Sequence, residues 1–386
     1  MAYRFGVIGL GVRISSVIDQ ALVQMEGEAV LAAIADPKSK DQLLKNIWPS
    51  TMKEPVEGAA LYSTAEEMLE NEKLDGVFVG TRCSSHARFA QMVHEKGLPL
   101  FLEKPICINM EDFKKLRDGY KAHNDTTVVS FPLRFTPVVC RVKNIVDSGV
   151  LGKIEHVSAV NYVPYGGTYF HDWYRDESET GGLFLQKSTH DFDYINFILG
   201  TDPVMVAAMA SKQIFKGDHE AGLKCVDCDQ YRECTESPYF INEKHDPENE
   251  SRCCYAVDTG NHDSASTLVR YESGMHVGYT QNFFARQKSL RRGAVFSGYK
   301  GTLEFDFYTS EIRVFYHQVK DTELIKISGV DKSHFGGDAV LIKNFLNVVR
   351  GTEKSKSTLR DGLMSALMCL KARESAETSE FKQIIF

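Results

Sequence analysis

The chain has 386 residues, with 45 Lys and Arg against 52 Asp and Glu, which gives a net charge of -7. Hydrophobic residues make up 43% and charged residues 25%, a globular composition that argues against a disordered, collagen-like or coiled-coil chain. The mild acidity gives no electrostatic reason to expect nucleic acid or an anionic membrane as a partner. The length predicts two domains.

The sequence also predicts a cellular location. No run approaches the ~20 apolar residues that span a bilayer. The N-terminus enters an apolar strand pattern at once, without the regions of a signal peptide. We therefore expect a cytoplasmic protein whose nine cysteines are thiols or metal ligands instead of disulfides.

A glycine turn follows the first predicted strand, residues 4–10, and precedes a predicted helix over 14–25. In this context Gly9 and Gly11 let the backbone approach a pyrophosphate at the helix N-terminus. The third position of this fingerprint holds Ile14 in place of Gly or Ala, which weakens the motif. A second strand, 29–35, ends at Asp36, whose carboxylate would bind ribose hydroxyls and repel a 2′-phosphate. The pattern predicts NAD over NADP; a solvated strand-end Asp is the alternative.

Two further strands continue the pattern. Residues 74–80 run into a turn from Thr81 to His86, and residues 99–102 end at Glu103, Lys104 and Pro105. Strands that alternate with helical patterns predict a doubly wound parallel sheet, with ligands beyond the carboxyl ends of its strands. An ammonium at Lys104 would stabilise a developing alkoxide, although most lysines are simply surface residues.

The order of these motifs resembles the glucose–fructose oxidoreductase and inositol dehydrogenase (Gfo/Idh/MocA) family over nearly the whole chain. The resemblance implies an α/β fold, with an N-terminal Rossmann domain (1–128) and a C-terminal α/β domain (129–386) built on a large, open, mostly antiparallel sheet. It places Lys104 near the nicotinamide and the reacting hydroxyl. The family's usual Pro after Thr81 is Arg82 here. The cofactor contacts that it implies are Gly9, Gly11, Val12, Arg13, Asp36, Thr81, Cys83, His86, Glu103 and Lys104.

The second domain carries the predicted substrate contacts. A strand over 127–130 leads to Arg134, which the resemblance places in the cleft; a solvated arginine is the alternative. Glycines among aromatic residues follow at 162–174, a composition that suits a sugar-binding wall but also a packed surface loop. The residues that we assign to substrate in this run are Tyr169, His171 and Trp173.

A helix predicted within residues 181–199 has two faces at 3.6 residues per turn. Leu185, Phe192, Ile195 and Leu199 form the apolar face, and Lys187, His190, Asp191 and Tyr194 lie opposite, flanked by Gln186 and Asp193. A solvated polar face is the alternative. The resemblance makes His190 the acid/base for the hydroxyl proton, with Gln186 where the family usually has Asp. Lys187 adds a cation, and Lys187 and Asp191 are predicted substrate contacts.

The function that follows is NAD-dependent oxidation of a secondary hydroxyl, at C3, of a sugar or glycoside, as in a pyranoside-oxidising subgroup of the family. His190 takes the proton, hydride leaves for the nicotinamide, and Lys104, with Lys187, holds the alkoxide. Neighbouring cations should lower the pKa of His190 and keep it neutral. Because C3 oxidation acidifies the C2 proton, a redox-assisted glycosidase without net NAD consumption is the alternative. A non-catalytic NAD-binding regulator ranks lower, because Lys104 and His190 are both present.

Five cysteines cluster in a polar segment, at about 218–256, which we interpret as an insertion loop. Four thiolates would pin such a loop around a structural zinc ion, with Cys225, Cys228, Cys234 and either Cys253 or Cys254 as ligands. An iron–sulfur cluster has the same ligand demands, and reduced thiols are the third possibility.

The rest of the chain predicts antiparallel strands at 264–269, 275–282, 292–297, 301–308 and 311–316. Helices follow at about 338–349 and 360–376, and His334 before the first of them either reaches the cleft or belongs to a helix cap. Family members associate through this sheet, so we expect a homo-oligomer.

Overall fold

The computed structural model describes residues 2–45, 47–241, 251–328 and 333–386. Residues 3–129 form a parallel sheet of six strands, in the order β3-β2-β1-β4-β5-β6. The doubly wound arrangement predicted from the alternating patterns is therefore confirmed. Its strands are β1 (Tyr3–Ile8), β2 (Ala29–Ala35), β3 (Ala60–Tyr62), β4 (Gly76–Val79), β5 (Leu100–Leu102) and β6 (Thr127–Val129). Its helices are α1 (Val12–Gln24), α2 (Lys40–Lys45), α3 (Lys53–Gly58), α4 (Ala65–Asn71), α5 (His86–Glu95) and α6 (Met110–His123).

The second sheet has nine strands in the order β14-β13-β12-β11-β7-β10-β9-β8-β15. All its pairs are antiparallel except that of β10 with β7, so the mostly antiparallel sheet is confirmed. Its strands are β7 (Ile154–Tyr162), β8 (Pro203–Ser211), β9 (Ser264–Tyr271), β10 (His276–Asn282), β11 (Arg291–Gly298), β12 (Gly301–Asp306), β13 (Glu311–Tyr316), β14 (Thr322–Lys326) and β15 (Lys382–Gln383).

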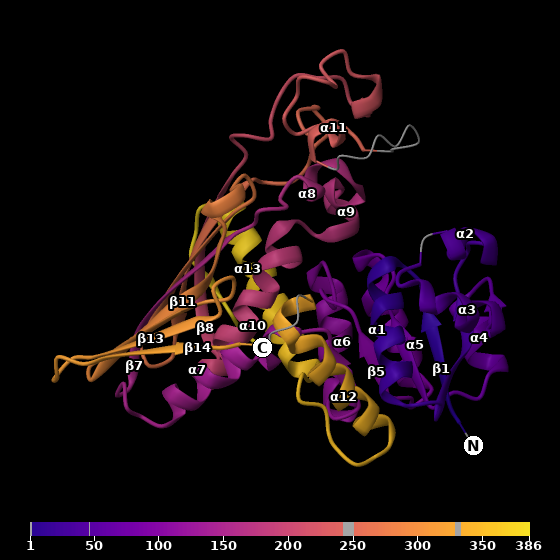
Figure 1. Cartoon of the computed structure of the whole chain (residues 1–386), viewed down its shortest axis with the longest axis horizontal. Helices are drawn as coiled ribbons and strands as arrows, with labels where there is room; N and C mark the ends of the chain where they lie inside the picture. The colour runs from indigo at the N-terminus through magenta and orange to yellow at the C-terminus, as the bar shows by residue number, and fades with distance from the viewer. Residues whose placement is uncertain (1, 46, 242–250, 329–332) are drawn as a thin grey trace.

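One face of this sheet is covered by helices that separate it from the Rossmann sheet (Figure 1). They are α7 (Pro137–Asp147), α10 (Thr189–Leu199) and α13 (Leu359–Thr378). The strands alternate accordingly: every second residue of β9 is buried, while Leu268 on its other face is exposed. The homo-oligomer expected through this sheet stays a prediction.

Helix α12 (Gly337–Val349) returns to the first domain and closes its core. The ring of Phe345 lies 6.2, 4.9 and 5.6 Å from those of Phe5, Phe78 and Phe101, which come from three strands of the parallel sheet. Figure 1 shows α12 beside α1 and the strands. Residues far apart in the sequence therefore share one hydrophobic core.

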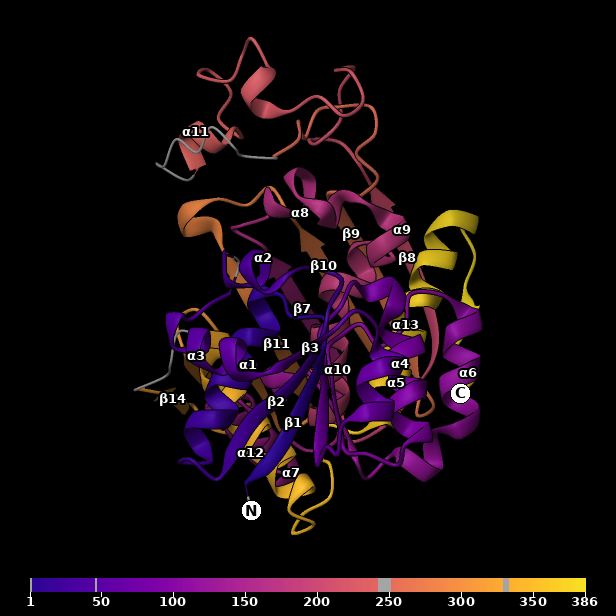
Figure 2. The ribbon, with the colours of Figure 1, turned by 90° about the vertical axis from the view of Figure 1, so that its right-hand side faces the viewer.

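The cysteine-rich segment between β8 and β9 extends beyond the end of the nine-stranded sheet in both views (Figures 1 and 2). It contains the short helix α11 (Pro238–Ile241). Part of the predicted insertion, residues 242–250, lies outside the described residues. Within the described ranges, no helix has the length and apolarity needed to cross a membrane.

Close packing of α1 on the sheet depends on a glycine outside the fingerprint. A Cβ placed on Gly80 would lie 2.5 Å from the Cβ of Ile14. Gly80 follows β4, so the space that a third fingerprint glycine usually provides on the helix is provided here by the strand. This explains how Ile14 is accommodated.

Replacing Gly80 by Ala should therefore overpack this contact and lower the free energy of unfolding by about 1–3 kcal/mol. In the background of Ile14→Gly, which removes the opposing Cβ, the same Gly80→Ala change should cost clearly less, because the added methyl then has room. Urea denaturation of the parent, the two single variants and the double variant measures both costs. An equal cost of Gly80→Ala in the two backgrounds would contradict the steric explanation.

Candidate active site

The glycine turn forms a cradle at the start of α1. Gly9 has a positive φ of 76°, and the N–H of Leu10 donates to the Asp36 carboxylate at 2.9 Å. A Cβ on Gly11 would meet no described atom within 4 Å, and the described side chains include no cap for the N-terminus of α1. Open space before a row of uncapped N–H groups fits the pyrophosphate of a dinucleotide. Asp36 lies at the end of β2, where it also shapes the turn.

Arg13 and Glu103 are held by other side chains of the protein. The guanidinium of Arg13 donates to both carboxylate oxygens of Asp338 at 2.9 and 2.6 Å and to Glu103 at 3.3 Å. Glu103 also accepts from Ser130 Oγ at 2.9 Å. His334 Nδ1 lies 2.9 Å from Asp338. These contacts join α1, the end of β5 and α12, so Arg13 positions the first helix.

The turn after β4 is anchored through His86. Its two ring nitrogens lie 2.8 Å from the Pro105 carbonyl and 3.1 Å from the Thr81 carbonyl. Burial lowers the pKa of His86. The imidazole therefore connects the Thr81 turn to the turn at Lys104. Cys83, in the same turn, accepts a hydrogen bond from the Gln186 amide at 3.2 Å.

Two lysines from different domains meet beside a π-helical turn, η5 (Phe184–Ser188), which leads into α10. Lys104 Nζ donates to the Gln186 carbonyl at 3.1 Å, and Lys187 Nζ donates to the Tyr165 hydroxyl at 2.5 Å. Burial lowers the pKa of both ammonium groups. The two cations therefore flank the start of the helix that carries His190.

His190 lies buried next to these cations. Its Nδ1 has no hydrogen-bond partner among the described residues. Its ring packs against Phe131 at 6.0 Å and His334 at 6.1 Å. Burial, and then the charges of Lys104 and Arg292, hold the pKa of His190 well below its usual value. The lowered pKa that the sequence predicts for His190 is thus found, but burial lowers it more than the neighbouring cations do. Gln186 does not orient this ring, because its amide contacts Cys83 and the Thr180 carbonyl.

The predicted two-faced helix is wrong, and with it the assignment of Asp191 to the cleft. Asp191 is fully buried and accepts from Arg292 Nε at 2.8 Å, Asn161 at 2.8 Å and Tyr279 at 3.0 Å. Tyr194 packs in the core against two phenylalanine rings of the second sheet. The reason is that α10 is covered on one side by the sheet, whose strands supply the partners of Asp191, and on another side by α13.

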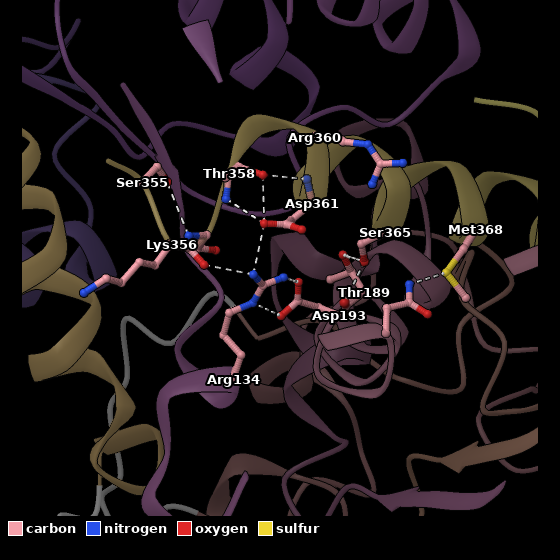
Figure 3. Close-up of polar contacts among 12 residues, drawn as sticks. Arg134, Thr189, Asp193, Ser355, Lys356, Thr358, Arg360, Asp361, Ser365 and Met368 are labelled. Carbon is pink, nitrogen blue, oxygen red and sulfur yellow. Dashed lines mark hydrogen bonds and ion pairs between the residues drawn. The ribbon is translucent and has the colours of Figure 1, made fainter. Parts of the chain in front are cut away.

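Arg134 is also held by partners within the protein instead of facing a substrate (Figure 3). It forms a buried two-pronged ion pair with Asp193, and its Nη1 donates to Asp361 and to the Lys356 carbonyl, each at 3.0 Å. Asp361 belongs to the first turn of α13. This network joins the segment after β6, α10 and α13, and every nitrogen of the guanidinium has a partner in it.

Of the predicted aromatic wall, Tyr169 lies at the site and Trp173 lies at its domain boundary. The Lys187 ammonium lies 5.2 Å from the centre of the Tyr169 ring. The Arg82 guanidinium lies 3.7 Å from the centre of the Trp173 ring, so the residue that replaces the family's Pro reaches across to the second domain. Near it, Ser84 donates to Glu179 at 2.6 Å.

His171 lies among the cysteines instead of in the cleft. Its Nδ1 is 2.7 Å from the Arg252 carbonyl and 3.6 Å from Cys225 Sγ. One small cavity is lined by Cys225, Cys228, Cys234, Cys253 and Cys254 together with His171 and His219. Within the described part of the chain, however, no three acidic, His or Cys side chains are arranged to hold a metal ion. The structure therefore gathers the predicted thiols without forming a coordination site.

Sequence reasoning did not assign two residues that the structure brings to the site, Tyr165 and Arg292. Tyr165 stood in the aromatic run, and no local pattern distinguished it from its neighbours. Arg292 lies near the start of β11, 101 positions after Asp191, which it contacts on α10. Only pairing of β11 with β7 brings its side chain under α10.

The Arg134 network allows a stability test. Arg134→Met leaves the Asp193 carboxylate buried without its cation, so we expect a loss of about 3–5 kcal/mol in the free energy of unfolding. Arg134→Met/Asp193→Leu should be clearly more stable than the single variant, because no buried charge remains unpaired. Denaturant unfolding compares them. An unchanged stability with a raised KM would restore the substrate-binding prediction.

Comparison with known proteins agrees with this geometry. Residues 3–131 match the model of an oxidoreductase family with an NAD-binding Rossmann fold, and residues 139–304 match the C-terminal domain of the Gfo/Idh/MocA family. An inositol 2-dehydrogenase from Rhizobium meliloti is 30% identical over 227 residues, covering 58% of this chain and 62% of that enzyme. A myo-inositol 2-dehydrogenase from Thermotoga maritima is 24% identical, covering 97% and 96%. The solved structure of a levoglucosan dehydrogenase with NADH and levoglucosan has the same fold, with a TM-score of 0.76 at 16% identity over 100% of both chains. The chain belongs to the Gfo/Idh/MocA family of NAD-binding oxidoreductases.

Proposed function

We propose that this protein oxidises a secondary hydroxyl, at C3, of a sugar or glycoside with NAD as the hydride acceptor. The observation that carries the proposal is the convergence of Lys104 and His190, from different domains, beyond the end of the parallel sheet. Lys104 Nζ binds the main chain at Gln186, one turn before His190, and its charge acts on the imidazole. A neutral base beside a fixed cation suits removal of a hydroxyl proton.

Each residue then has a defined task. Gly9, Gly11 and Asp36 would hold NAD, which would supply the hydride acceptor when bound. His190, kept neutral by its surroundings, accepts the hydroxyl proton. Lys104 stabilises the negative charge that develops on the oxygen as the proton leaves. The aromatic rings of Tyr165 and Tyr169 offer apolar surface to the C–H groups of a sugar ring, while their hydroxyls and Lys187 offer polar contacts.

The relatives support a sugar-like substrate, because their names are those of inositol and levoglucosan dehydrogenases. The sugar itself and the position of oxidation rest on the resemblance to pyranoside-oxidising members. Redox-assisted glycoside cleavage uses the same first step, so the assay must follow both products.

The test is an assay of NADH formation with NAD and a panel of pyranoses and aryl glycosides, with aglycone release measured in parallel. We expect NADH and keto-sugar to rise together, and Lys104→Met to lower kcat by about 10²–10³-fold. Lys114→Met, which removes an exposed lysine of α6, is the matched control. Aglycone released over many turnovers without net NADH would establish the glycosidase instead. No reaction across the panel would contradict the proposal.

We also propose that the cysteine-rich segment binds a structural zinc ion through Cys225, Cys228, Cys234 and Cys253 or Cys254. The support is the shared cavity and the chemistry of the donors, since thiolates are preferred zinc ligands. The segment has few apolar residues of its own, so a bound ion would supply stability that packing does not.

Metal analysis of the purified full-length protein tests this. We expect about one zinc per chain, lost in Cys228→Ser and kept in Cys140→Ser, which removes an exposed thiol of α7. A brown protein with bound iron would favour the cluster instead. Protein free of both metals would contradict any metal site.

A further inference from the structure

Tyr165 is a half-exposed tyrosine bound to a buried ammonium. Its side chain is 50% exposed, whereas that of Lys187 is 7% exposed. Its hydroxyl oxygen lies 2.5 Å from Lys187 Nζ, which is also 4.4 Å from the centre of the Tyr165 ring. The phenol oxygen is thus fixed by a cation on its inner side while its ring borders solvent.

Among the described residues, the Lys187 ammonium forms no ion pair with a carboxylate, and its hydrogen bond goes to Tyr165. The nearby Asp191 carboxylate is taken by Arg292 and Asn161. A buried charge without a counter-ion is costly. Ionisation of Tyr165 would supply that counter-ion.

The charged groups around Tyr165 favour the ionised form of its phenol. Burial by itself would raise the pKa of Tyr165, but the charges of Lys187, Arg292 and Lys104 outweigh it and lower that pKa. The neighbouring phenols behave differently: burial raises the pKa of Tyr169, and it raises the pKa of Tyr308 to about 12. Tyr165 is therefore the acidic phenol of this group.

His190, by contrast, is poorly placed to keep a proton. Its ring is 6% exposed, its Nδ1 lacks a partner among the described residues, and cations surround it. An imidazolium formed there would be strongly destabilised. A proton taken from a substrate must therefore move on to a group in contact with water.

We propose that Tyr165, held by Lys187, is a second proton-exchanging group of the cleft and passes the substrate proton from His190 to solvent. The inference rests on the proposed oxidation. The O–H bond of the substrate breaks and its proton goes to the imidazole, while the electron pair of the C–H bond leaves as hydride to NAD. The proton then moves from the imidazolium to the Tyr165 phenolate across a substrate hydroxyl. The new phenol O–H releases the proton to water, and reduction runs the same steps in reverse.

Titration of the resting protein, followed by the ultraviolet absorbance of phenolate, tests the pair without any turnover. We expect one tyrosine to ionise below the usual range, and this transition to vanish in Tyr165→Phe. It should persist in the matched control Tyr308→Phe, which removes a phenol with a raised pKa. Lys187→Met should move the transition upward. A low transition that survives in Tyr165→Phe would overturn the proposal.

Turnover gives the second readout. Tyr165→Phe should lower kcat by on the order of 100-fold, a larger effect than the rise in KM from the lost hydroxyl contact, and added imidazole buffer should restore part of kcat. Neither parent nor Tyr308→Phe should depend on buffer concentration. A Tyr165→Phe enzyme with parental kcat and no buffer dependence would overturn the relay. If the parent oxidises no sugar, the proposed function fails, and the titration alone decides whether Tyr165 is the acidic group.

Discussion

The buried carboxylate of Asp191 is the interaction on which the cleft depends. It binds Arg292, Asn161 and Tyr279, which belong to the adjacent strands β11, β7 and β10. One side chain thereby ties α10 to three strands at once, and a buried hydrogen-bonded network of this kind favours a single arrangement. His190 is the preceding residue, and Lys187 lies one turn earlier. Their positions follow from a contact that does not itself touch the cleft.

The electrostatics of the site follow from the same arrangement. Asp191 and Asp193 are both paired inside the protein, with Arg292 and Arg134 respectively. The lysines at the cleft are left without carboxylate partners of their own among the described residues. Unbalanced positive charge in a desolvated cleft favours anions and neutral bases. This is the environment in which an alkoxide forms at low cost.

The relative placement of the two domains rests on several separate contacts. Ser84 donates to Glu179, Arg82 stacks on Trp173, and Lys104 binds the carbonyl of Gln186. Each joins a loop of the parallel sheet to a residue from beyond position 130. Hydride transfer needs the cofactor and the substrate to be held within a narrow range of separation, and contacts of this kind across a domain boundary restrict that separation.

The features of this protein that could be predicted from its sequence are those whose motif lies within a short stretch of the chain. The glycine turn and the run ending at Lys104 could be read because a strand, its end and the following turn lie within a few residues of each other. Helical periodicity located the segment of His190 but assigned Asp191 and Tyr194 to the wrong surroundings. A helical wheel separates faces, yet it cannot tell that both faces of α10 are covered.

The sequence by itself therefore determined the two sheets, the cradle for a dinucleotide and the residue types available for chemistry, because periodicity and turn motifs act over short distances. Only the tertiary structure decided which charges meet. Arg134 and Arg292 find carboxylates on α10, His171 lies with the cysteines, and Tyr165 meets Lys187. The physical reason is that the pairing of a buried charge depends on side chains brought together from distant segments, and no pattern within one segment records them.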